Sequence, residues 1–156
     1  MKKNLIIDAV CGAFILLFIY ASISKLIDFP EFRIQIRKSP MLTAYAPVVA
    51  VVIPLVEIGI SVLLAIRRLR LFALYAAFSL MTIFTTYIYI ILHFSDYIPC
   101  SCGGVLQNLS WRQHLGVNLI FVVLAIVAIL IYPVDVAPGR AAAGDKTGIA
   151  ENLLPE

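Results

Sequence analysis

Residues 5–24 read LIIDAVCGAFILLFIYASIS, a run in which only Asp8 carries a charge. About 20 consecutive apolar residues cross the hydrocarbon core of a bilayer as one α-helix. Lys2, Lys3 and the small residues near Ala21 also fit a signal peptide loosely. The run is long and further apolar runs follow it, so we predict a retained membrane-spanning helix.

The composition supports a membrane protein. The chain has 156 residues, of which 62% are hydrophobic and 13% charged, and its mean hydropathy is +1.01. Soluble domains are closer to half apolar and a quarter charged. The net charge of +3 is too small to indicate a nucleic-acid partner. The lysines and arginines form short clusters between apolar runs, where membrane topology accounts for them.

Three further apolar runs predict three further spans, over residues 45–66, 71–92 and 114–132. The predicted fold is therefore all-α, a four-helix transmembrane bundle forming one membrane domain over residues 1–133. Residues 134–156 are rich in Ala, Gly, Pro and charge, and they show no periodic apolar face. We expect a flexible C-terminal tail there.

The polar connection between the first two spans has helical character. Its apolar residues recur at helical spacing, and two arginines fall on the opposite face. These residues are Phe29, Phe32 and Ile36, with Arg33 and Arg37. The pattern predicts a short amphipathic helix lying in the membrane interface. A solvated loop with one turn of helix is the alternative.

Two acidic residues fall within or near the membrane. Glu57 lies near the middle of the second span, where an unpaired ionised side chain costs at least ~2.5 kcal/mol. We expect it to face the bundle interior, protonated or hydrogen-bonded. It would serve either a proton or substrate path or a structural hydrogen bond to a Thr or Tyr of a neighbouring span. For Asp8, near the membrane edge, we expect the structural role.

Polar and small residues also mark the last two spans. One side of the third span carries Thr82, Thr85, Thr86 and Tyr89. We interpret these as helix-contact residues rather than as a quinone site. In the fourth span Gly116 and Asn118 suit close contact with another helix.

Two cysteines stand one residue apart between the last two spans. Cys100 and Cys102 can close into a small, strained disulfide ring, and strain makes such a bond easier to reduce. Pro99 stiffens the entry, and two following glycines let the backbone turn and leave the sulfurs accessible. We predict that this pair is catalytic. The alternative is a loop with two free or statically bonded thiols. Cys11, inside the first span, is expected to be a packed apolar residue.

Three basic side chains flank the cysteines and are candidate supporting residues, as is Glu57. Arg112 or either of His93 and His114 would favour the reactive thiolate if it lies close. The histidines are either polar end groups or, for His114 with Asn118, a proton relay. Both cysteines and both histidines together form a possible zinc or copper set, but their irregular spacing is unlike a zinc finger. We predict no metal site.

The number of lysines and arginines on each side does not settle the topology, but one short basic turn favours both termini in the cytoplasm. Residues 67–70 form a short basic turn without an acidic residue, the setting in which the positive-inside rule is most dependable. The cysteine loop then faces the extracytoplasmic space, where disulfide chemistry persists.

Four motifs together resemble the MauE/DoxX family of redox-associated membrane proteins. They are Ser24-Lys25-Leu26-Ile27-Asp28, Phe32, Pro54-x-x-Glu57-x-Gly59 and Cys100-Ser101-Cys102-Gly103. The resemblance implies a bacterial inner-membrane protein with its thiol pair outside the cytoplasm. It also implies disulfide or electron transfer with a periplasmic thioredoxin-like partner, in the service of the maturation of envelope proteins. DoxX-type relatives add quinone as a possible cofactor.

These observations give one leading hypothesis and two alternatives. The first is an inner-membrane thiol–disulfide redox protein that relays electrons through Cys100 and Cys102. The second is a non-catalytic subunit that scaffolds a larger envelope complex in the lipid bilayer, with the cysteines as a static brace. The third is a membrane protein that binds a metal through Cys and His side chains.

Overall fold

The computed structural model describes residues 2–38, 43–94 and 111–133, and in these ranges the chain is helical apart from short turns. The helices are α1 (Lys2–Ile27), α2 (Phe29–Lys38), α3 (Ala46–Ala65), α4 (Arg70–Phe94) and α5 (Trp111–Ile131). Two 3-10 turns, Thr43–Tyr45 and Arg67–Leu69, precede α3 and α4. The predicted all-α fold is confirmed.

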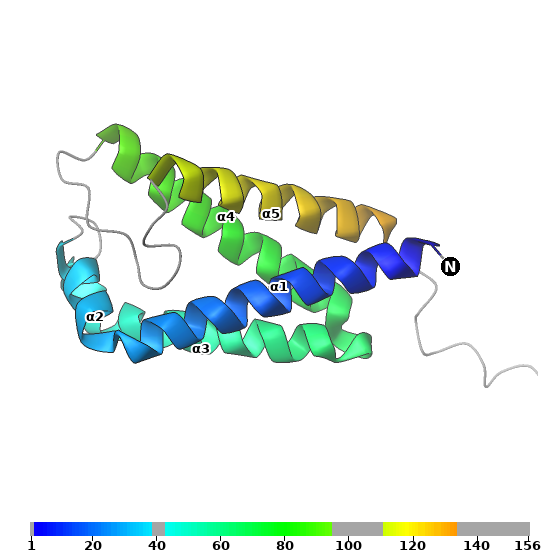
Figure 1. Ribbon diagram of the computed structural model, residues 1–156, viewed down its shortest axis with the longest axis horizontal. Helices are drawn as coiled ribbons and strands as arrows, with labels where there is room; N and C mark the ends of the chain where they lie inside the picture. The colour runs from blue at the N-terminus through cyan, green and yellow to red at the C-terminus, as the bar shows by residue number, and fades with distance from the viewer. Residues whose placement is uncertain (1, 39–42, 95–110, 134–156) are drawn as a thin grey trace, which may run out of the picture.

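The long helices form two antiparallel pairs, α1 with α3 and α4 with α5 (Figure 1). α1 and α4 run in one direction along the molecule, and α3 and α5 run in the other. α2 lies at the end where α1 and α4 finish and where α3 and α5 begin. We call this the α2 end, and the opposite end, which holds the first turn of α1, the N-terminal end.

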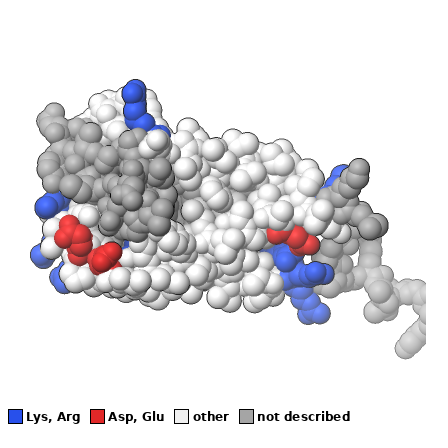
Figure 2. All heavy atoms as spheres, in the orientation of Figure 1, with Lys and Arg blue, Asp and Glu red and all other residues white. Residues whose placement is uncertain are grey.

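Within the part of the chain that the structure describes, four helical stretches are long and apolar enough to cross a membrane. They are Lys3–Ile27, Thr43–Ala65, Arg67–Phe94 and Arg112–Ile131. Charged side chains gather toward the two ends of the face shown in Figure 2, with an uncharged band between them. The four predicted spans are confirmed, with the first helix continuing three residues beyond the predicted limit at Ser24. The predicted tail, residues 134–156, lies outside the described residues.

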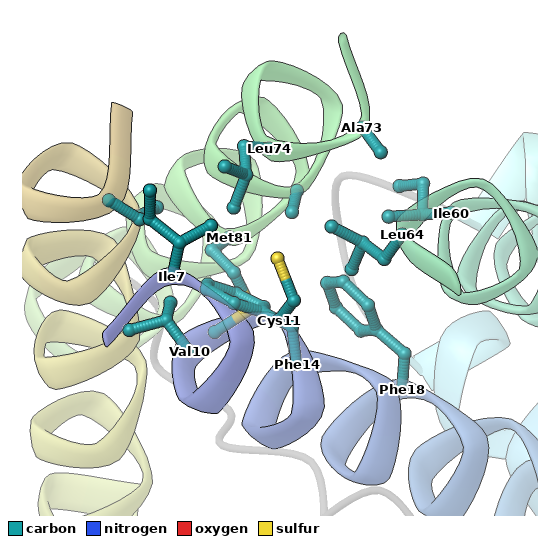
Figure 3. Close-up of a cluster of buried hydrophobic side chains, with 13 residues drawn as sticks. Ile7, Val10, Cys11, Phe14, Phe18, Ile60, Leu64, Ala73, Leu74 and Met81 are labelled. Carbon is teal, nitrogen blue, oxygen red and sulfur yellow. The ribbon is translucent and has the colours of Figure 1, made fainter. Parts of the chain in front are cut away.

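The main apolar core combines large side chains of α1 with small ones of α4 and α5 (Figure 3). Phe14 and Phe18 are almost fully buried, and the Phe14 ring meets Phe121 of α5 edge-on with centroids 5.1 Å apart. The alanines that allow this approach are all fully buried: Ala73 and Ala77 on α4, with Ala125 and Ala128 on α5. Because lipid is as apolar as these side chains, close packing rather than water exclusion stabilises such contacts.

Cys11 belongs to this core. Its side chain points among Ile7, Phe14 and Leu74, and only 1% of the residue is exposed (Figure 3). The prediction that Cys11 is a packed apolar residue is confirmed.

α2 is the predicted amphipathic helix. Phe32 and Ile36 are buried against Ala46 and Ala50 in the first turns of α3, and the α2 arginines are exposed. The alternative of a solvated loop is wrong, because these apolar side chains have a helix face to pack on. α2 covers the first turns of α3. The end of α1 therefore contacts α3 nearer the middle of α3, at Glu57.

One expectation about the last spans is wrong. A Cβ atom added at Gly116 would meet nothing within 4 Å, so this glycine does not mark a close helix contact. Of the α4 residues expected at helix contacts, Thr85 is partly buried, whereas Thr82, Thr86 and Tyr89 are exposed on the outer side of α4. Asn118 is buried as expected, and its Nδ2 donates to the His114 carbonyl at 3.2 Å.

The packing of α2 on α3 can be tested with Ala50→Leu, matched by Gly59→Leu on the same helix. Ala50 is fully enclosed, whereas a Cβ at Gly59 meets open space. We expect Ala50→Leu to lower the free energy of unfolding by ~1–3 kcal/mol through overpacking. Gly59→Leu should cause no loss. Thermal unfolding in detergent measures both variants, and equal effects would contradict the packing described here.

Candidate functional site

Glu57 is the most buried acidic or basic side chain among the described residues. It is 1% exposed and lies on α3, within the apolar span Thr43–Ala65. Its Oε1 is 2.5 Å from the Lys25 Nζ, and its Oε2 lies 3.0 Å from the Ser22 Oγ. The prediction of an inward-facing, hydrogen-bonded Glu57 is confirmed. The expected Thr or Tyr partner is wrong, because both partners are a Ser and a Lys of α1.

Ser22 gives this site two possible hydrogen-bonding arrangements. Its Oγ is fully buried, 2.6 Å from the Phe18 carbonyl and 3.0 Å from Glu57. A hydroxyl has one proton to donate and two lone pairs that accept. Ser22 can therefore donate to an ionised Glu57, or donate to Phe18 and accept from a protonated Glu57. The geometry accommodates both charge states of the carboxyl.

Lys25 connects the carboxyl to two further helices. Its Nζ lies 6.0 Å from the ring centroid of Phe32 on α2 and 5.8 Å from that of Phe84 on α4. Aromatic faces attract a cation at such distances, and more strongly when it is removed from water. Only 12% of the Lys25 side chain is exposed. Ser22, Lys25 and Glu57, here called the polar centre, thus touch four of the five described helices.

Electrostatics explains why these charges occur together. Either charge alone would lose its hydration without compensation, and the penalty for a single ion in a protein interior is several kcal/mol. At 2.5 Å in a medium of low dielectric constant their attraction is far stronger than in water. The pair therefore holds the end of α1 against the middle of α3.

The sequence interpretation missed the role of Lys25. Lys25 stands there only as part of the motif Ser24-Lys25-Leu26-Ile27-Asp28, with no role of its own. A signal was available, because an acid within a span needs a compensating partner and sequential short-linked spans are antiparallel. The sequence does not show which turn of α3 lies beside the end of α1. That register depends on how α2 packs on the first turns of α3.

The two histidines lie toward the α2 end in different surroundings. His93 is exposed near the end of α4, and its ring stacks on Tyr89 with centroids 4.3 Å apart. His114 is partly buried in the first turn of α5 and lies within range of the Lys25 charge. Arg112 is exposed beside it in sequence. The structure thus brings His114 toward the polar centre, while His93 packs on its own helix.

Cys100 and Cys102 lie outside the described residues, and their catalytic role stays a prediction. The helices on either side, α4 ending at Phe94 and α5 beginning at Trp111, reach the α2 end. Within residues 2–38, 43–94 and 111–133, no three His, Cys, Asp or Glu side chains are placed to hold a metal. Because Thr82, Thr86 and Tyr89 face outward, they do not line a quinone site inside the bundle.

A second ion pair joins Asp8 and Arg70 at the N-terminal end. Arg70 Nη1 contacts Asp8, and its Nε donates to the Leu64 carbonyl at 3.1 Å. The Asp8 side chain is 45% exposed, in contrast to Glu57. The expected structural role for Asp8 agrees with this geometry, with Arg70 rather than Thr or Tyr as its partner.

The fold and the polar centre define a four-span membrane protein with a buried ion pair between its helices. The family model described as methylamine utilisation protein MauE matches residues 3–131, and the chain belongs to this family. It is 36% identical over 115 residues to methylamine utilization protein MauE of Paracoccus denitrificans. That alignment covers 71% of this chain and 61% of the relative. No solved structure matches the chain.

Removal of one member of the buried pair should be costly. We expect Glu57→Leu or Lys25→Met alone to lower the free energy of unfolding by ~3–5 kcal/mol, because each leaves an uncompensated buried charge. The double variant should recover most of that loss. Thermal unfolding in detergent of both single variants and the double variant measures the coupling.

The exposed pair supplies the control. Asp8→Leu removes the partner of Arg70 at a position open to solvent, where ion pairs contribute ~0–1 kcal/mol. Equal losses for Asp8→Leu and Glu57→Leu, or additive losses in the Lys25 and Glu57 double variant, would contradict a buried, coupled pair.

Proposed function

We propose that this protein is a membrane thiol–disulfide component of methylamine utilisation, in which Cys100 and Cys102 cycle between dithiol and disulfide. The support is threefold. The chain belongs to the MauE family, the relative from Paracoccus denitrificans is named for methylamine utilisation, and the sequence carries two cysteines one residue apart.

The exchange needs no reactant beyond a partner disulfide, such as that of a periplasmic thioredoxin-like protein. A thiolate of the pair attacks one partner sulfur, forms a mixed disulfide and releases the other partner sulfur as a thiolate. The second cysteine of the pair then attacks the mixed disulfide, closes the Cys100–Cys102 bond and releases the remaining partner sulfur. Two electrons pass to the partner, and the two thiol protons end on its cysteines. The reverse sequence reduces the pair.

One observation carries the proposal: the proton-exchanging side chains of the membrane helices gather toward the α2 end. His93 and His114 flank the segment with the two cysteines, and the polar centre lies within range of His114. Thiol attack requires a thiolate, so a group that holds the released proton must be near. Histidine is the side chain best suited to that task near neutral pH.

We place the α2 end outside the cytoplasm of the bacterial cell, with both termini inside. The N-terminal end carries Lys3, Arg67 and Arg68, while the only acid of the described residues there, Asp8, is paired with Arg70. The α2 end carries basic residues too, but Asp28 and Glu31 lie among them, whereas the short turn at residues 67–70 has no acid. A short, purely basic turn is typical of the cytoplasmic side. The thiol pair then meets an oxidising compartment.

Differential alkylation tests this function in membranes held first reducing and then oxidising. We expect Cys100 and Cys102 to label with a membrane-impermeant maleimide added from outside after reduction, and to lose labelling on oxidation. Cys11 is the internal control, because it is 1% exposed and should stay unlabelled in both states.

Genetic replacement separates exchange from scaffolding. Cys100→Ser combined with Cys102→Ser should abolish growth on methylamine while the protein still inserts in the membrane, whereas Cys11→Ala should not. Full growth of the double variant would favour a scaffold with a static brace. Stoichiometric zinc or copper in the purified protein, lost in the double variant, would favour a metal-binding role.

A further inference from the structure

The outer face of α4 carries a stripe of side chains along the whole span, all polar apart from Phe72 at its start. Its members recur at intervals of three and four residues and are all exposed: Phe72, Tyr75, Ser79, Thr82, Thr86, Tyr89 and His93. We call this set the α4 stripe. It runs over 22 residues, about 33 Å of helix, enough to cross the hydrocarbon core.

The stripe lies opposite the side of α4 that packs in the bundle. The buried residues of α4 occupy the other face, with Leu74, Ala77 and Met81 in the main core. A helix with apolar residues inside and polar residues outside is ordinary in water, but it is inverted for a membrane span. Polar residues within a membrane usually face protein or a water-filled cavity rather than lipid.

The spacing of the stripe keeps its members on one side of α4. Steps of three and four residues place them along one line of the helix, as on any helix face. One neighbouring helix can therefore contact all of them at once.

The chemistry of the stripe indicates which helix. We propose that the α4 stripe is the contact surface for a second copy of this chain, forming a parallel dimer about a two-fold axis along the membrane normal. Two copies inserted with the same topology have parallel α4 helices, so each stripe position meets its own counterpart. The stripe holds donors in the phenols of Tyr75 and Tyr89 and acceptors in the oxygens of Ser79, Thr82 and Thr86, so the stripe of one copy is complementary to that of another. A stripe of one charge would repel its copy.

The hydrogen bonds within α4 fit this arrangement. Ser79, Thr82 and Thr86 each donate to the carbonyl four residues earlier, at 2.9, 2.8 and 2.8 Å. Each hydroxyl oxygen keeps lone pairs that accept from the opposite helix, and the phenols of Tyr75 and Tyr89 are donors on the same seam. The single copy thus satisfies its hydroxyl protons and still offers acceptors to a partner.

Neighbouring threonines provide a matched pair of variants. Thr85 and Thr86 both donate to a backbone carbonyl of their own helix, but Thr86 is exposed on the stripe and Thr85 is partly buried beside it. Dimerisation of the full chain in lipid bilayers is measured by single-molecule photobleaching over a range of protein densities. We expect Thr82→Val with Thr86→Val to weaken dimerisation by about tenfold or more, since interhelical hydrogen bonds in membranes contribute about 0.6 kcal/mol each. Thr85→Val should leave it unchanged.

Crosslinking locates the contact independently of stability. In a full chain with Cys11→Ala, Cys100→Ser and Cys102→Ser, Thr86→Cys should form an intermolecular disulfide on oxidation. Val123→Cys, 56% exposed on α5, should not. A wild-type protein that stays monomeric at every density overturns the proposal. So does crosslinking through Val123, or capture of Thr86 by a different membrane protein.

Discussion

The structure depends on the cost of placing one carboxyl in the middle of an apolar span. Glu57 loses nearly all its contact with solvent, and lipid offers it no hydrogen bond. Lys25 and Ser22 compensate the carboxyl from α1, and the aromatic rings of Phe32 and Phe84 surround the ammonium. In a membrane, where water exclusion does not bring helices together, such a directional interaction adds to close packing in fixing which helices meet and at which depth.

Small residues make that interaction possible. Ala46 and Ala50 let α2 lie close on the start of α3, and this contact positions the end of α1 beside Glu57 rather than beside the first turn of α3. The buried alanines of α4 and α5 let the phenylalanines of α1 fill the other side of the bundle. The ion pair holds the end of α1, and the apolar core holds its middle. A movement of α1 that breaks one of these contacts therefore weakens the other.

Features set by residues close together in the sequence were predicted, whereas features set by contacts between distant helices were not. Apolar run length fixes a span, so all four membrane helices were predicted, and helical spacing was enough for α2. Burial of Glu57 followed from the cost of an exposed charge in lipid. Its partner did not, because Lys25 reaches Glu57 only through the register of α1 on α3. Gly116 was misjudged for a related reason: small residues permit close contact, but only the bundle decides which face of α5 is covered.

The threonines of α4 show the same limit and also explain how an outward polar stripe is tolerated. Their polarity predicted a helix contact, yet the four helices of one copy leave Thr82 and Thr86 outside and bury only part of Thr85. A hydroxyl that donates to the carbonyl one turn earlier carries little penalty in lipid, because its proton is already bonded. The single bundle can therefore fold first, held by the polar centre, with the stripe still facing lipid. Two folded bundles then associate by exchanging contacts with lipid for contacts between their helices. Folding before association is the order in which membrane helices generally assemble. The inward ring of Phe84 and the outward stripe lie on one helix, so pairing through α4 would join two polar centres through rigid elements rather than through loops.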